Sequence, residues 1–203
     1  MKTLVVTLAT LLIAAGIGNA QTNLPFDVYV YGGMSVPENP GFFSTEYNEG
    51  FHFGAGVSRN LLPHVDGRFQ VAYHRMTSGF GIADGGTIQL ATFGLNARGY
   101  IPTGFMQTTL FAWAGGGIAS LSQDDFQMIL TEEEVFFIAT DRLVIGSQTK
   151  GYFEAGVGVE YDAMPQVKIF AQGGFLQMLA SRAGSVYDND LRILTISAGV
   201  KLF

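Results

Sequence analysis

The chain has 203 residues, enough for one ordinary domain, and carries 11 Lys and Arg against 17 Asp and Glu, a net charge of −6. This acidic balance argues against nucleic acid as a partner, and the absence of cysteine excludes both a disulfide framework and a lipid anchor on a processed cysteine. The 27 glycines, 17 phenylalanines and 8 tyrosines favour β-structure.

Residues 1–20, MKTLVVTLATLLIAAGIGNA, have the layout of a secretory signal peptide. Lys2 precedes an apolar run from Leu4 to Ile17, and small residues follow up to Ala20. The run is shorter than the about 20 residues of a spanning helix, so we expect cleavage after Ala20 rather than an N-terminal membrane anchor. The mature chain, residues 21–203, loses only Lys2 among its charges and would carry 10 Lys and Arg against 17 Asp and Glu, or −7.

Eight later segments alternate apolar with polar or small residues, as expected of strands. They span residues 25–36, 50–60, 65–77, 86–101, 105–123, 148–162, 166–180 and 190–203. Each is near or above the about nine to eleven residues that cross a bilayer as a tilted strand. No run of about 18 apolar residues follows residue 20, so a chain of this composition that spans a membrane must do so as a β-barrel.

The two faces of these strands are clearest in segments 50–60 and 148–162. Their apolar set comprises Phe51, Phe53, Ala55, Val57, Phe153, Ala155, Val157, Val159 and Tyr161. The alternate positions hold polar residues or glycine, apart from Tyr152, so one face suits lipid and the other does not. For segment 105–123 the alternation does not settle which set faces outward.

The connections between segments alternate in length. Those at 37–49, 78–86, 124–147 and 181–189 are long, whereas those at 60–64, 102–104 and 162–165 are short. With eight strands, this pattern places every long loop on one side and both termini with the short turns. We therefore predict that residues 21–203 form an all-β fold, a closed antiparallel up-and-down transmembrane β-barrel of eight strands.

The chain ends in ISAGVKLF, residues 196–203, which also alternates. Leu202 and Val200 continue an apolar set, and Lys201 belongs to the other face. A last strand with an apolar face would leave an exposed sheet edge unless another strand paired with it. The first strand, near Phe26 to Val30, is the expected partner in a closed barrel.

This pattern resembles the OmpA/OmpX-like superfamily of small outer-membrane β-barrels over essentially the whole mature chain. The stretches that carry the resemblance are YGGMSVP at 31–37, FHFGAGVSRN at 51–60, FEAGVGVEYD at 153–162 and SAGVKLF at 197–203. The resemblance implies a bacterial outer-membrane location, surrounding outer-membrane lipid, periplasmic termini, and Phe203 as the signal read by the barrel-insertion machinery. Members commonly place an aromatic residue two positions before a terminal Phe, where this chain has Lys201.

Charged side chains on the polar face would lie inside such a barrel. They are Asp27, Arg68, Arg98, Glu154, Glu160, Lys168 and Lys201. An eight-stranded barrel is just wide enough for side chains to fill, so these charges must pair or form hydrogen bonds. We prefer a static network of ion pairs over a gated ion path.

The sequence gives no sign of catalytic, cofactor or metal chemistry. His52, His64 and His74 are the only histidines, and His74 with Ser78 could begin a Ser–His–acid site, but no nucleophile elbow or partner spacing accompanies them. We expect His52 and His74 to form hydrogen bonds inside the barrel. The acidic residues of 124–147 lack the spacing of a calcium loop, and its apolar stretches predict a protruding hairpin that could take up another strand.

These observations favour a structural or surface-interaction protein whose extracellular loops meet a ligand or another protein. The alternative is a small channel or transporter for small apolar molecules, and a lipid-modifying enzyme is retained only because the resembling fold has hosted one. A secreted lipocalin-like barrel would have the opposite faces, apolar inside and polar outside. A filled interior would favour a scaffold, and a continuous lumen or side opening would favour transport.

Overall fold

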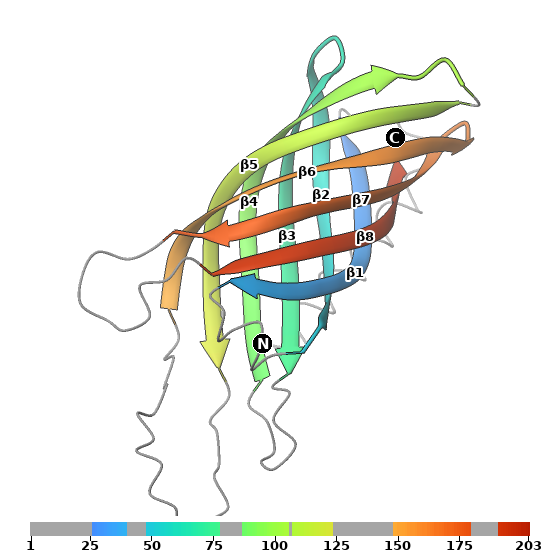
Figure 1. The fold of residues 1–203 in the computed structure, drawn as a ribbon. Coiled ribbons are helices and arrows are strands. Elements are labelled where there is room, and N and C mark those ends of the chain that lie inside the picture. The colour runs from blue at the N-terminus through green and yellow to red at the C-terminus, as the bar shows by residue number, and fades with distance from the viewer. Residues whose placement is uncertain (1–25, 40–47, 78–86, 106, 124–147, 180–190) are drawn as a thin grey trace, which may run out of the picture.

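The computed structural model describes residues 26–39, 48–77, 87–105, 107–123, 148–179 and 191–203, which form eight antiparallel strands (Figure 1). The strands are β1 Asp27–Asn39, β2 Gly50–Leu62, β3 Val65–Thr77, β4 Thr87–Pro102, β5 Thr108–Gln123, β6 Gln148–Met164, β7 Val167–Met178 and β8 Arg192–Leu202. Each corresponds to one predicted segment. Among the described residues, no helix is long and apolar enough to cross a membrane.

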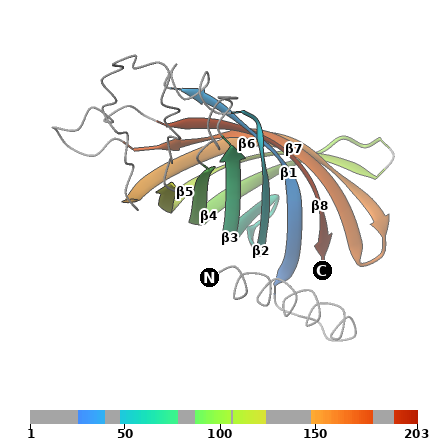
Figure 2. The ribbon, with the colours of Figure 1, turned by 90° about the horizontal axis from the view of Figure 1, so that it is seen from below.

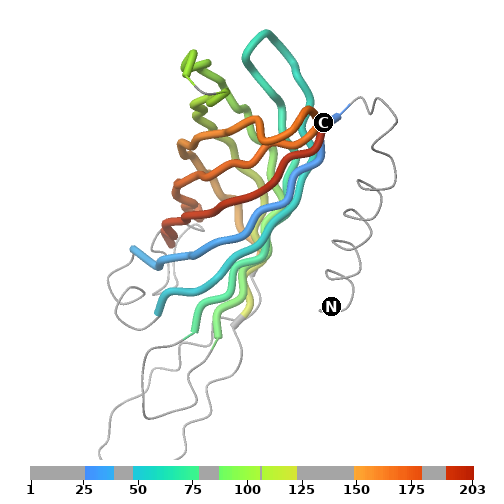
Figure 3. Tube along the Cα trace, turned by 90° about the vertical axis from the view of Figure 1, so that its right-hand side faces the viewer, coloured from blue at the N-terminus to red at the C-terminus, as the bar shows by residue number. Residues whose placement is uncertain are grey.

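The strands close into a barrel in chain order, because β8 pairs with β1 as well as with β7. Val28 lies opposite Leu202, and Val30 lies opposite Val200. The predicted closure of the last strand against the first is therefore confirmed. Figure 2 shows the strands curving around the interior, and Figure 3 shows the C-terminal end of β8 beside the start of β1.

The predicted alternation of long and short connections is also confirmed. Short turns at 63–64, 103–107 and 165–166 lie at the same end of the barrel as the start of β1 and the end of β8, here called the turn end. The opposite end, with the connections at 40–49, 78–86, 124–147 and 179–191, is called the loop end. In the β2–β3 hairpin His64 has a positive φ of 66°, a conformation typical of tight hairpin turns.

The outward face of the barrel is apolar along most of its length. Leu95 and Val157 are exposed to 69% and 65%, whereas Arg98 and Glu160 are each exposed to only 1%. In β5, Phe111 and Trp113 point inward. This determines which set of residues faces outward in the one strand whose sequence alternation was ambiguous. Apolar side chains outside and charges inside are the arrangement of a membrane barrel and the reverse of a lipocalin.

Part of the interior is apolar, which the sequence pattern did not predict. The loop-end ends of β3 to β8 contribute a cluster of buried residues, here called the apolar plug. It comprises Met76, Ile88, Leu90, Ala119, Leu121, Tyr152, Leu176, Met178 and Ile193. Near the loop end these strands are therefore largely apolar on their inward face, so the interior is filled there by hydrophobic packing rather than by ion pairs.

Large aromatic side chains inside the barrel lie against glycines of other strands. A methyl group at Gly156 or Gly174 would lie 2.8 Å from the indole of Trp113, and one at Gly158 would contact the ring of Phe111. These glycines therefore leave room for rings that span the interior. The aromatic layer, defined as Tyr29, Phe111, Trp113 and Phe170, is a second cluster of buried side chains, and its residues pair across the strands with Lys201, Arg98 and Glu160.

Candidate functional site: the charged interior of the barrel

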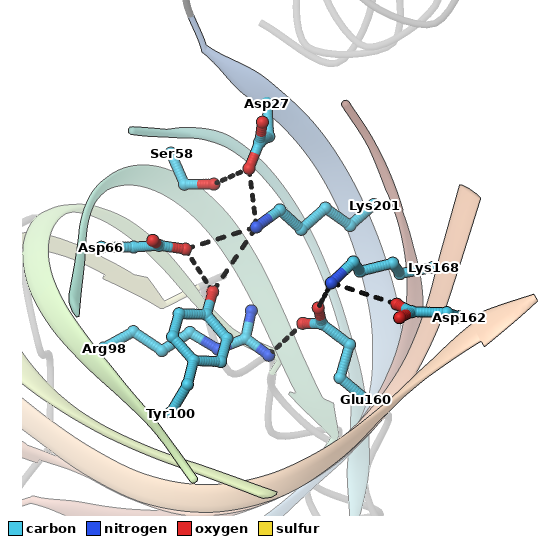
Figure 4. A network of polar contacts seen from close by, with 9 residues as sticks. All are labelled: Asp27, Ser58, Asp66, Arg98, Tyr100, Glu160, Asp162, Lys168 and Lys201. Carbon is cyan, nitrogen blue, oxygen red and sulfur yellow. Dashed lines mark hydrogen bonds and ion pairs between the residues drawn. The ribbon is translucent and has the colours of Figure 1, made fainter. Parts of the chain in front are cut away.

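The turn end of the interior contains a network of charged side chains drawn from β1, β3, β4, β6, β7 and β8 (Figure 4). Its best-buried ion pair joins β4 to β6. Arg98 Nη2 lies 2.6 Å from Glu160 Oε2, and both side chains are almost completely buried. Because β5 lies between these two strands in the wall, the pair spans the inside of the barrel rather than one strand interface.

Lys168 extends this pair toward the rim of the turn end. Its Nζ lies 3.1 Å from Glu160 Oε1 and 3.0 Å from Asp162 Oδ1. Glu160 is therefore shared between a guanidinium and an ammonium group, one on each carboxylate oxygen. Asp162 is half-exposed, so its contact with Lys168 forms the solvent-facing edge of the network.

A second centre forms around Lys201 of β8. Lys201 Nζ lies 2.7 Å from Asp27 Oδ2 and 3.3 Å from Asp66 Oδ2, and Tyr100 donates its hydroxyl hydrogen to Asp66. Ser58 also donates a hydrogen bond to Asp27. One ammonium group thus holds β1, β3 and β8 together at the turn end, with β4 attached through Tyr100 (Figure 4).

Aromatic rings cover the cations of this network. The Arg98 guanidinium carbon lies 3.4 Å from the centroid of Phe111, and that of Arg68 lies 4.0 Å from the centroid of Tyr29. A guanidinium over a ring face gains a cation–π interaction while it remains out of water.

Arg68 and Glu154 lie outside this ion-pair network and are connected to each other through neighbouring side chains. Neither forms an ion pair within 4.0 Å among the residues that the structure describes. Gln70 donates from Nε2 to Glu154 Oε1 at 2.5 Å, and the Tyr29 ring that lies against Arg68 has its hydroxyl 3.5 Å from Gln70 Oε1. Tyr29 and Gln70 therefore connect the two charges.

All seven predicted interior charges point into the barrel. Five of them form ion pairs, whereas Arg68 and Glu154 are stabilised by a ring face and hydrogen bonds instead. Asp66 was not among the predicted interior charges, but it is fully buried and shared by Lys201 and Tyr100. The sequence pattern does indicate this position, because Asp66 stands two residues before Arg68 in the same strand and therefore on the same face.

The two interior histidines share a serine near the loop end. Ser35 Oγ lies 3.1 Å from His52 Nδ1 and 2.9 Å from His74 Nδ1, and the rings stack with centroids 5.1 Å apart. The single hydroxyl hydrogen can serve only one imidazole, so the other histidine donates to Ser35 Oγ. The expectation that His52 and His74 form hydrogen bonds inside the barrel is confirmed.

The histidines do not form a hydrolase site with the predicted partner. Ser78 lies outside the described residues, and His64 is exposed in the β2–β3 turn. Ser35 is completely buried among the packed side chains of the interior. Its hydroxyl is therefore not placed to reach a substrate as a nucleophile. Within the described ranges, no group of three or more His, Cys, Asp or Glu is placed to hold a metal ion. The acidic segment 124–147 also lies outside them.

Sequence comparison finds no matching protein family and no matching curated protein. Comparison with solved structures does find a match, Neisserial surface protein A, with a TM-score of 0.60 over 88% of this chain and 97% of that chain, at 19% identity. The chain has the fold of the small outer-membrane β-barrels.

Two further barrels align over similar lengths. A major outer membrane protein of Thermus thermophilus covers 87% of this chain and 98% of its own, at 14% identity and a TM-score of 0.49. Ail, the attachment invasion locus protein of Yersinia pestis, covers 87% and 97%, at 13% identity and a TM-score of 0.44. At these identities the likeness concerns the fold alone.

Proposed function

We propose that this protein is a bacterial outer-membrane barrel that acts as a structural or surface-interaction protein and presents its four long connections outside the cell. The observation that carries the proposal is the filled interior. Ion pairs and aromatic rings stacked on the cations occupy the interior toward the turn end, and the apolar plug occupies the loop end. A transporter would need a continuous path past both groups of side chains.

We also propose an orientation of the barrel in the outer membrane. The outward apolar face contacts outer-membrane lipid, and both termini of the mature chain lie in the periplasm with the short turns. Residues 1–20 act as the signal peptide, so N-terminal sequencing of the exported protein should give Gln21 as the first residue. The likeness to a protein named as a surface protein supports this placement. The long connections are then the parts available to an extracellular ligand or protein.

Epitope insertion tests the orientation. A short epitope inserted in 124–147 should be bound by antibody on intact cells, because this connection leaves the barrel at the loop end. The matched control carries the same epitope in the turn 103–105 and should be labelled only after the outer membrane is made permeable. Labelling of the turn variant on intact cells would contradict the proposed orientation.

Deletion of Phe203 tests the proposed insertion signal. Phe203 is half-exposed at the turn end, so its removal should cost folded stability only on the order of 1 kcal/mol. If the insertion machinery reads this residue, cells producing the deletion variant should accumulate it in the periplasm or degrade it. The same variant should refold in detergent with nearly unchanged melting. Normal surface labelling of the variant would show that Phe203 is not the signal.

A further inference from the structure

The middle of the barrel contains a small cavity of about 20 Å³. Its wall is partly polar and includes Gln70, Trp113, Glu154, Gln172 and Thr195. Leu176 of the apolar plug and both interior histidines, His52 and His74, also line the cavity.

Two polar groups of this wall have no protein partner. Trp113 Nε1 is a donor and Gln172 Oε1 is an acceptor, and neither atom forms a hydrogen bond with another described residue. Trp113 itself is more than nine-tenths buried. A buried donor or acceptor without a partner costs free energy that native proteins avoid in most cases.

Glu154 adds a charge to the same wall. Gln70 Nε2 and Tyr152 Oη both donate to its Oε1 atom, at 2.5 Å and 3.4 Å. The carboxylate has no ion pair within 4.0 Å among the described residues, although every other carboxylate of the interior network has one. A buried carboxylate of this kind needs further donors to remain ionised.

We propose that the cavity binds one ordered water molecule that accepts a hydrogen bond from Trp113 Nε1 and donates to Gln172 and to the Glu154 carboxylate. The size agrees, because a polar cavity of more than roughly 10–15 Å³ holds one water with two to four partners. Water fits this site because the unpartnered groups of the wall are a donor, Trp113 Nε1, and an acceptor, Gln172 Oε1, and a water molecule can both accept and donate hydrogen bonds. The site is independent of the proposed function.

The single tryptophan of the chain makes the site measurable. In ¹⁵N-labelled protein in detergent micelles, Trp113 gives the only indole N–H signal. A water-selective NOE experiment should show direct magnetisation transfer from water to this proton. The NOE should have the sign expected for a water molecule that tumbles with the protein. Thr195→Val should retain the transfer, which excludes relay through the Thr195 hydroxyl. Absence of transfer in the wild type would overturn the proposal.

A second test compares a variant that fills the cavity with a variant that leaves it open. Ala72 lines the cavity, so Ala72→Met should expel the water, abolish the NOE and shift the Trp113 emission to shorter wavelength. Ala72→Ser leaves the cavity open and should retain both the NOE and the wild-type emission wavelength of Trp113. Gln172→Met removes an acceptor without filling the space, and should reduce the NOE if Ala72→Met fails to fold. An NOE that persists unchanged in the folded Ala72→Met or Gln172→Met variant would also overturn the proposal.

Discussion

Replacement of Glu160 by glutamine should lower the free energy of unfolding by about 3–5 kcal/mol, the usual cost of removing one partner from a buried ion pair. Glu160 is completely buried and contacts both Arg98 and Lys168. Glutamine keeps the volume but removes the charge, so the Arg98 guanidinium would remain buried without a carboxylate. Urea unfolding of the barrel in lipid vesicles, followed by Trp113 fluorescence, measures the loss.

Two variants control this result. Asp162→Asn removes a half-exposed partner of the same lysine, and should change stability by less than about 1 kcal/mol. The double variant Arg98→Met with Glu160→Met removes both buried charges and should be more stable than Glu160→Met alone. Equal losses in Glu160→Gln and Asp162→Asn would contradict the assignment of Glu160 as the centre of the network.

Replacement of Val157 by arginine should destabilise the barrel by about 2–4 kcal/mol if the residue lies near the bilayer midplane. Val157 is exposed on the outward face in the middle region of β6, between Ala112 of β5 and Gly173 of β7. A charged side chain there would face hydrocarbon. Refolding into vesicles and urea unfolding provide the measurement.

Val157→Leu is the matched control for this position. Leucine is apolar and has free space on the outward face, so the control should fold and melt like the wild type. Insertion of Val157→Arg with wild-type stability in bilayers would show that this face does not contact lipid. The same arginine variant should be tolerated in water if the barrel were a secreted, lipocalin-like protein.

The strands, their faces and the closure of the barrel could be predicted from the sequence because all three depend on a period of two. Phe51 and His52 point to opposite faces in any register, and the alternation of connection lengths determines which ends lie together. Eight strands that alternate in this way have few topologies other than a closed meander. For this reason the predicted pairing of Val30 with the last strand was correct.

The contacts inside the barrel could not be predicted in the same way. Arg98 and Glu160 belong to strands that are not neighbours, so their meeting depends on the stagger of the strands around the barrel and on the side chains between them. The inward choice for Phe111 and Trp113 follows from glycines on β6 and β7 that make room for the rings. Such complementarity is a property of the assembled interior, not of one segment.

Single-channel recording in planar bilayers tests the closed interior most directly. The purified wild-type protein should give no large, steady current, because oppositely charged side chains, aromatic rings and the apolar plug occupy the interior. Glu160→Gln should remain non-conducting as long as it is folded, since the plug at the loop end is unchanged. A reproducible wild-type conductance that Glu160→Gln or Arg98→Met abolishes would contradict the closed interior and establish an ion path through the network.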